Sequence, residues 1–189
     1  MIRLLYIILM AGLYASCVND LVEVNQLFEK SEPGVEVARD IEMLYSDSAI
    51  VRVRVIGATL VRHLEADKPR DEFPDGIHID FLDPDGTVNS TLDAERADRY
   101  TRDKKVIARS DINKSTPVIL QNNQGERLET SELIWDEARG QVFTEKFVKI
   151  TRPEEIIYAY GFVAKQDFSE YELKKVVGRF KVEDQEFKN

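Results

Sequence analysis

This sequence is poor in the residues on which metal centres and covalent catalysis depend. Its 189 residues include one cysteine and two histidines, His63 and His78. One cysteine excludes an intrachain disulfide, and neither histidine has a cysteine or carboxylate at a spacing typical of zinc ligands. A glycine-rich phosphate loop and a Gly-x-Ser-x-Gly motif are also missing from the sequence. We therefore expect no enzyme activity, no metal site and no cofactor.

Basic residues are outnumbered by acidic ones. The chain has 26 lysines and arginines against 35 aspartates and glutamates, which gives a net charge of −9, and no basic cluster interrupts this balance. Proteins that bind nucleic acids concentrate cations to neutralise phosphate groups. Nucleic acid is therefore not an expected partner.

Long apolar runs are confined to the N-terminus. Arg3 precedes an apolar stretch over residues 4–13, and small residues then lead to Cys17. This order is typical of an export signal, and the stretch is shorter than the ~20 residues that span a bilayer. The residues before Cys17, LYAS, resemble a bacterial lipobox, so we expect a signal peptide over residues 1–16 and a lipid anchor on Cys17. An uncleaved N-terminal anchor and an ordinary signal peptide remain alternatives.

The remaining chain divides into a short tether and one domain. Residues 17–34 are polar, mixed in charge and end in Pro33-Gly34, which predicts a lipid anchor followed by a tether. Residues 35–189 suffice for one domain, and the hydrophobic fraction of 43% in the whole chain supports a sizeable core.

Apolar and polar residues alternate through this domain. The clearest examples are Val51, Val53, Val55, Ile77, Ile79 and Phe81. A period of two with β-branched and aromatic residues predicts half-buried antiparallel strands. The segments Phe73-Pro74-Asp75-Gly76 and Asp83-Pro84-Asp85-Gly86 place Pro second and Gly last, as in a type I turn. We expect no helix and an all-β domain.

Residues 86–150 contain the same pattern twice. An offset of 36 residues, which places Leu92 on Leu128, holds through this stretch without a gap. A fixed period of this size indicates stacked supersecondary units, each of which cannot bury its apolar face alone. The alternation shifts by one residue after Thr130, as a β-bulge would produce. Hairpins stacked and bent in this way predict a twisted antiparallel β-jellyroll, or open sandwich, with a V-shaped or slit-like section.

Four segments of the chain carry a resemblance to a known family. They are YSDSAIVRVRVIGATLVRH, FPDGIHIDFLDPDGTVNSTLDAERADRY, GERLETSELIWDEARGQVFTEKFVKIT and IIYAYGFVAKQDFSEYELKKVVGRF, and they extend over roughly residues 40–182. In order and extent they resemble the LptC/OstA family of the lipopolysaccharide export system, to which LptA also belongs. The short tether and the lipobox-like segment differ from the uncleaved transmembrane helix of many LptC proteins.

The resemblance implies a β-jellyroll with an apolar slot for lipid. Lipopolysaccharide extracted by the LptB/LptF/LptG transporter would enter the slot with its acyl chains inside and its sugars outside. An LptA-type bridge protein, docked on the C-terminal edge, would then take the lipid toward the outer membrane. The N-terminal edge would contact LptF or LptG, and the protein would lie in the periplasm, anchored to the inner membrane.

The apolar residues expected to face inward are the candidate slot. They are Val53, Val55, Ile79, Phe81, Leu92, Val106, Leu128, Val142, Val148 and Ile150. Alternating apolar residues are far more often packed core than ligand contacts, so core packing is the first interpretation of each position taken singly. A docking edge is expected in YELKKVVGRFKV, at Tyr171, Leu173, Val176 and Phe180, where a partner strand could extend the sheet. The alternative is that the cations of this segment simply solvate a terminal strand.

A function from another class also fits the sequence. A membrane-anchored β-sandwich lipoprotein with a fully packed interior would bind a glycan or a protein through Trp135, Tyr158, Tyr160 and Tyr171. An apolar slot left open along the length of the sheets would distinguish the lipid carrier from this binding module.

Overall fold

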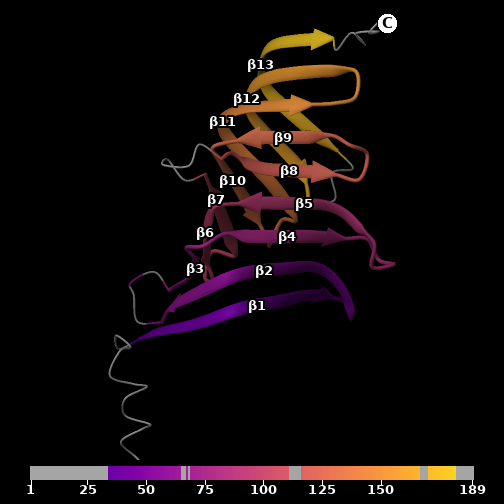
Figure 1. Cartoon of the computed structure of the whole chain (residues 1–189). Helices are drawn as coiled ribbons and strands as arrows, with labels where there is room; N and C mark the ends of the chain where they lie inside the picture. The colour runs from indigo at the N-terminus through magenta and orange to yellow at the C-terminus, as the bar shows by residue number, and fades with distance from the viewer. Residues whose placement is uncertain (1–33, 65–66, 68, 111–115, 167–169, 182–189) are drawn as a thin grey trace, which may run out of the picture. The chain divides into compact units, whose positions relative to one another are not determined.

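Thirteen antiparallel β-strands form the described part of the chain (Figure 1). The computed structural model describes residues 34–64, 67, 69–110, 116–166 and 170–181, and these residues form no helix and therefore no helical membrane span. The strands are β1 (Val35–Asp47), β2 (Ile50–His63), β3 (Arg70–Phe73), β4 (Ile77–Leu82), β5 (Val88–Ala94), β6 (Arg96–Tyr100), β7 (Lys105–Arg109), β8 (Val118–Asn122), β9 (Arg127–Thr130), β10 (Glu132–Asp136), β11 (Gln141–Thr151), β12 (Glu155–Lys165) and β13 (Tyr171–Lys181). The prediction of an all-β antiparallel domain is confirmed.

The strands form one sheet that folds over into two layers. Layer A faces the viewer in Figure 1 and follows the order β2-β4-β5-β8-β9-β11. Layer B lies behind it and follows the order β2-β3-β6-β7-β10-β11. The long strands β2 and β11 belong to both layers, because one half of each pairs in layer A and the other half in layer B. Strand β1 lies beyond β2, and β12 and β13 follow beyond β11.

The fold line, which we call the seam, is a column of bends at equivalent positions in successive strands. The chain passes from layer A to layer B at Glu95, between β5 and β6, and again at Ser131, between β9 and β10. These bends are 36 residues apart, so both sequence repeats fold into the same bent unit. Farther along, β11 has a register shift after Thr144, and Gly161 in β12 has a φ of 79°, which glycine adopts without strain.

The opposite side, which we call the mouth, carries the hairpin turns of both layers. Layer A contributes residues 83–87, 123–126 and 152–154, and layer B contributes residues 101–104 and 137–140. The predicted turn at Asp83–Gly86 is one of them: the amide of Gly86 donates to the carbonyl of Asp83 over 2.9 Å, and Gly86 has a φ of 86°. The layers are therefore continuous in backbone at the seam and end in turns at the mouth.

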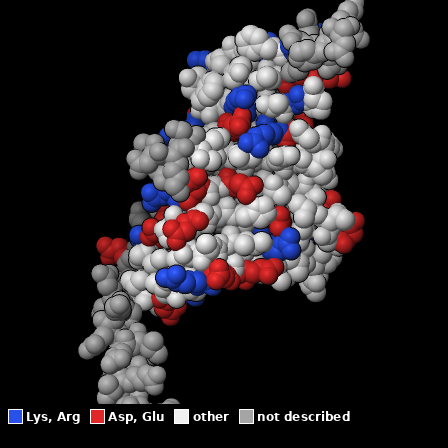
Figure 2. Space-filling model, viewed as in Figure 1, with Lys and Arg blue, Asp and Glu red and all other residues white. Residues whose placement is uncertain are grey.

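The core lies between the layers. Alternate apolar residues of both layers point inward and form one cluster, in which the following are at most 3% exposed: Ile79, Leu92, Leu120 and Leu128 from layer A, and Phe73, Ala97, Ala108 and Leu133 from layer B. Outward positions of layer A carry charges that pair across strands, such as Arg54 with Asp80 at 2.7 Å. Figure 2 shows acidic and basic side chains interspersed over the face in view. The strands are thus half-buried, as their alternation predicted.

Candidate functional site

The ten predicted slot residues all lie in the core between the layers. None is more than 4% exposed: Val53, Val55, Ile79, Phe81, Leu92, Val106, Leu128, Val142, Val148 and Ile150. Because so little of these side chains is exposed, they pack against other protein atoms in this structure and do not line an open slot. Contact with lipid stays a prediction, and an acyl chain would reach these side chains only if the layers separate.

Aromatic side chains close the mouth near the N-terminal end of the sheet. Trp135 of layer B meets Phe81 of layer A edge to face, with ring centroids 5.4 Å apart. Tyr45 of β1 approaches the same indole at 6.1 Å. Trp135 is 3% exposed, and its Nε1 donates a hydrogen bond to Gln166 Oε1 over 3.1 Å. Aromatic pairs of this kind add ~0.5–1.5 kcal/mol each beyond burial, so side chains stabilise this end of the mouth.

A group of paired charges lies beside these rings. Arg99 of β6 binds Glu137 through two hydrogen bonds, Nε to Oε1 at 2.6 Å and Nη2 to Oε2 at 3.1 Å. Its Nη1 donates to Asp71 over 3.4 Å, and Asp71 also accepts from Arg62. The hydrogen bond to Glu137 raises the pKa of Arg99. The Arg99 guanidinium lies 5.1 Å from the Tyr45 ring centre, and burial raises the pKa of the Tyr45 hydroxyl. The charges of this cluster therefore compensate one another.

Gln166, which follows β12, joins the two layers farther along the mouth. Its backbone N–H donates to the carbonyl of Gly140 over 2.9 Å, and its side-chain oxygen accepts a hydrogen bond from Trp135, so two hydrogen bonds attach Gln166 to layer B. Its own carbonyl accepts a hydrogen bond over 3.3 Å from Ser90 of layer A, a fully buried side chain. One such bond contributes about 1 kcal/mol, so the connection across the mouth is weak.

The third contact across the mouth lies near the C-terminal end. Tyr171, the first residue of β13, packs on Phe162 with ring centroids 5.8 Å apart. The guanidinium carbon of Arg152, in the turn between β11 and β12, lies 5.1 Å over the Tyr171 ring. Arg152 also pairs with Glu126 at 2.9 Å and with Glu155 at 2.8 Å. Throughout the described residues, no backbone-to-backbone hydrogen bond joins the turns of layer A to those of layer B.

No pattern in the sequence predicted Arg99, Arg152 or Gln166 as mouth residues. The partners that they meet are distant in the chain; Ser90 and Gln166 are 76 residues apart. A polar residue near a hairpin turn is ordinarily solvated, so its type and position gave no signal of a contact with the other layer. Phe81 was the residue of the mouth that the alternation predicted to face inward.

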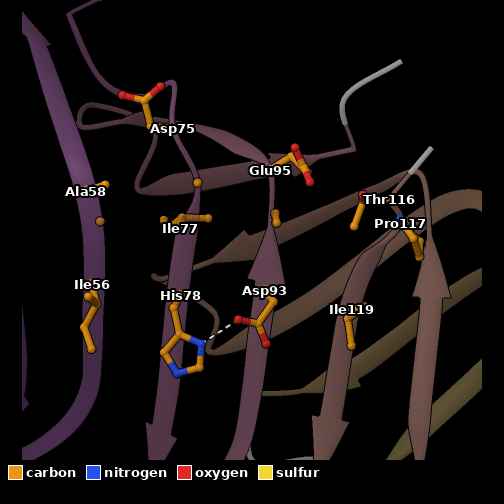
Figure 3. A pocket seen from close by; sticks show the side chains of 13 residues that line it. Ile56, Ala58, Asp75, Ile77, His78, Asp93, Glu95, Thr116, Pro117 and Ile119 are labelled. Carbon is orange, nitrogen blue, oxygen red and sulfur yellow. Dashed lines mark hydrogen bonds and ion pairs between the residues drawn. The ribbon is translucent and has the colours of Figure 1, made fainter. Parts of the chain in front are cut away.

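A pocket of about 430 Å³ lies on layer A beside the seam (Figure 3). Its lining includes one residue from each of four neighbouring strands, which pair in register: Ile56, His78, Asp93 and Ile119. His78 Nδ1 lies 2.6 Å from Asp93 Oδ1, and its Nε2 lies 3.0 Å from Asp80 Oδ1. The lining also includes the small residues Gly57, Ala58, Gly76 and Ala94.

The two carboxylates around His78 make this pocket sensitive to pH. Burial by itself would lower the pKa of His78, but the hydrogen bonds to Asp93 and Asp80 outweigh it and raise the pKa. The folded chain therefore binds this proton more tightly than the unfolded chain. The resulting stability is fully present below the unfolded pKa of about 6.5 and is lost as the pH rises through the higher folded pKa.

We expect His78→Asn to reduce the loss of stability between pH 6 and pH 8.5. The difference should be only a few tenths of a kcal/mol, because solvent screens an imidazole that is 38% exposed. Urea unfolding of both proteins at the two pH values measures it. An identical pH dependence in the variant would contradict the assignment of this proton to His78.

Strands β1 and β13 are the two ends of the sheet. Among the residues that the structure describes, β1 pairs only with β2 and β13 only with β12. Tyr171 and Leu173 pack against the core from β13, and Val176 lies on the same side of the strand, opposite Ala159, but is 51% exposed. Phe180 lies on the outer face, with its ring 5.8 Å from Tyr158. The edge residues thus do not share one face, because Val177 is an extra residue at a register shift and reverses the alternation.

The four aromatic residues expected to form a glycan platform also lie on different faces, which corrects that expectation. Trp135 is buried between the layers, and Tyr171 packs on the core side. The outer face carries a different aromatic cluster, in the order Tyr160, Phe147, Tyr158 and Phe180, with ring centroids 5.3–5.9 Å apart between successive members. Successive residues of a strand point to opposite faces, and the predicted platform was chosen by residue type without regard to the face on which each residue lies.

Comparison with known proteins adds no assignment. No protein-family model and no curated protein sequence matches this chain. The likeness to the LptC/OstA family therefore stays a resemblance, carried by the sequence segments quoted above. Cys17, with the predicted signal peptide and lipid anchor, lies outside the described residues.

Proposed function

We propose that this chain is a periplasmic carrier of lipopolysaccharide, anchored to the inner membrane through Cys17. The observation that supports this most is how the interior is enclosed. One apolar core lies between two layers that share backbone at the seam, whereas in the described residues every contact that joins the two layers at the mouth involves a side chain. Separation of the layers at the mouth would expose a continuous apolar trough without breaking a strand pairing.

The chemistry of the lipid gives a physical reason for such a trough. An acyl chain has about a dozen methylene groups, each worth ~0.8 kcal/mol when kept from water, so one exposed chain costs ~10 kcal/mol. A lipid with several chains needs an apolar carrier to cross an aqueous compartment. The inward side chains of the two layers offer that surface, and the polar turns at the mouth would remain beside the sugars.

The ends of the sheet differ in charge, which suits different partners. Strand β1 has one cation and four acids: Glu36, Asp40, Glu42 and Asp47. Strand β13 has one acid and four cations: Lys174, Lys175, Arg179 and Lys181. In this proposal an LptA-type protein adds a strand to β13, and the LptB/LptF/LptG transporter contacts β1.

The strand directions define how a partner of the same fold would pair. Along the order β1-β2-β4-β5-β8-β9-β11-β12-β13, each strand is antiparallel to the next. The first and last strands therefore run in the same direction. A partner domain stacked in the same orientation would pair its first strand parallel to β13.

Photocrosslinking at two phenylalanines tests the carrier function. The photoreactive residue benzoylphenylalanine replaces Phe81, which is 2% exposed at the mouth, or Phe147, which is 44% exposed on the outer face. With transporter, ATP and lipopolysaccharide present, we expect a lipopolysaccharide adduct at position 81 and none at position 147. Circular dichroism first confirms that both variants keep the strand structure.

The alternative function predicts a different pattern in the same experiment. A binding module with a permanently packed interior would bind its glycan or protein on the outer aromatic cluster, where Tyr160 is 51% exposed and Phe180 is 60% exposed. Lipopolysaccharide adducts at position 147 alone would favour this module. The absence of adducts at position 81, with a folded protein and an active transporter, would refute the carrier.

A further inference from the structure

The hydroxyl of Tyr171 is a buried polar group without a partner. Its oxygen is shielded from solvent and forms no hydrogen bond with any residue that the structure describes. An unpaired buried hydroxyl costs free energy, and native proteins keep few of them. Tyr171 stands at the mouth, packed on Phe162 with Arg152 over its ring. The hydroxyl is therefore an unused hydrogen-bond donor at the edge of the proposed lipid site.

Tyr171 borders a small space whose lining is mainly apolar. The other residues around it are Leu120, Glu126, Arg127, Leu128, Ile150 and Phe162. The space is about 10 Å³, which is roughly the room that one water molecule needs. Leu128 and Ile150 belong to the predicted slot, so Tyr171 lies where the interior meets the mouth.

We propose that Tyr171 Oη donates a hydrogen bond to the carbonyl oxygen of a neutral acyl ester or amide. The alkyl chain of that acyl group would lie beside Leu128 and Ile150. This inference rests on the proposed carrier function and identifies the part of the site that takes the head of an acyl chain. Hydrogen bonding to the ligand gives the hydroxyl the partner that it otherwise lacks.

The cations near Tyr171 favour a neutral carbonyl over a carboxylate. Glu126 and Glu155 compensate the charge of Arg152, although its buried Nε lies 2.9 Å from Glu126 without forming a hydrogen bond, and Arg127 pairs with Glu129 at 3.3 Å. A fatty-acid carboxylate would have to displace one of these acids while losing its own hydration. An ester or amide carbonyl brings an acceptor without a charge, so one neutral donor suffices.

An alkyl chain can enter only if Tyr171 moves, because the space beside Tyr171 is too small to hold it. The restraints on its ring are weak at this position. Arg152 stacks on it at a partly exposed site, where cation–π attraction is small. Strand β13 pairs on one side only among the described residues, so displacement of its first residue disturbs one row of hydrogen bonds.

Tyr171→Phe tests the inference, because it removes the hydroxyl and keeps the ring. We expect the variant to bind 1-lauroylglycerol, which has an ester carbonyl, about fivefold more weakly than the wild-type chain does. Binding of 1-O-dodecylglycerol, the ether that lacks the carbonyl, should not change. Both affinities are measured by displacement of the fluorescent apolar probe 1-N-phenylnaphthylamine.

The melting temperature without ligand supplies an independent readout. The hydroxyl has no partner in the free protein, so the variant should melt at the wild-type temperature or above it. A lower melting temperature would show that the hydroxyl supports the fold and would overturn the inference. An equal change for both glycerol lipids, or no change for either, would overturn it too and leave the carrier function standing.

A third ligand, laurate, distinguishes a neutral ester or amide from a free fatty-acid carboxylate. Laurate has the same chain with a carboxylate head, and we expect its affinity to fall less than that of 1-lauroylglycerol. A larger fall for laurate would overturn the assignment of a neutral carbonyl. If the wild-type protein binds none of the three lipids, the inference fails, and crosslinking at position 81 decides the proposed function separately.

Discussion

Phe81→Ala is expected to lower the free energy of unfolding by about 3–5 kcal/mol, the usual cost of truncating a buried phenylalanine to alanine. Phe81 is 2% exposed and packs edge-on against Trp135. Its removal would leave a cavity beneath the mouth and take away the contact between the layers at Trp135. Small domains are stable by only about 5–15 kcal/mol, so the loss is a large fraction of the total. Urea unfolding followed by circular dichroism measures it.

Phe147→Ala is the matched control, because it removes the same side chain from the outer face. Phe147 is 44% exposed, so its truncation should cost less than about 1.5 kcal/mol. The ratio of the two effects reports whether the interior is closed in solution. Similar small losses in both variants would contradict the closed core and indicate that Phe81 is solvated.

The stability lost by Phe81→Ala also bears on how the proposed carrier would work. A closed core that loses several kcal/mol when one ring is truncated gains that free energy from contacts between the layers. A lipid must replace those contacts when it separates the layers, and its acyl chains bring apolar surface of the same kind. The free energy lost when the layers separate is then nearly matched by the free energy gained when lipid binds. Such a balance suits a carrier, because a carrier must also release its lipid.

The strands and turns were predictable because they follow from local rules. Alternation with β-branched residues defines which side chains of β2 and β4 face inward, and it placed all ten slot residues in the core. The Pro and Gly positions of the segment Asp83–Gly86 define a turn by backbone sterics alone. The 36-residue repeat indicated the position of two bends, since Glu95 and Ser131 occupy equivalent places in its copies.

The closure of the mouth was not predictable from the sequence. It depends on residues that are far apart in the chain and become neighbours only when the sheet folds along the seam, such as Ser90 with Gln166 and Arg152 with Tyr171. None of these pairs has a spacing or composition that distinguishes it from solvated residues near turns. Whether the apolar interior is filled or open was likewise beyond the sequence, because both arrangements produce the same alternation.

The position of Phe180 shows how one extra residue reverses the faces to which the later side chains of a strand point. Val176 pairs with Ala159 and lies on the core side of the strand, whereas Gly178 pairs with Tyr158, the residue before Ala159. Val177 is therefore extra in β13, and every later side chain of the strand changes face. The sequence shows no proline or other signal for a bulge at this place, so Phe180 was predicted in one docking edge with Tyr171, Leu173 and Val176, although it lies on the other face of the strand.

Arg99→Met is expected to lower the free energy of unfolding by about 3 kcal/mol. The arginine side chain is 16% exposed and binds Glu137, which is 12% exposed, and Asp71, which is 4% exposed. Removal of the cation leaves these carboxylates without their shared partner in a poorly hydrated place, and that loss exceeds the worth of the pairs themselves. Methionine keeps most of the apolar stem, so the change reports the charge. Urea unfolding at neutral pH measures it.

Arg139→Met is the matched control, since Arg139 pairs with Asp136 at 3.8 Å while 74% of its side chain is exposed. Solvent screens such a pair, so the control should change stability by less than about 0.5 kcal/mol. The double variant Arg99→Met/Glu137→Leu should recover part of the loss, because it removes an uncompensated charge. If Arg99→Met cost no more than Arg139→Met, water would have to reach Asp71 and Glu137 in solution. The inward side of layer B at this end of the mouth would then be hydrated without lipid.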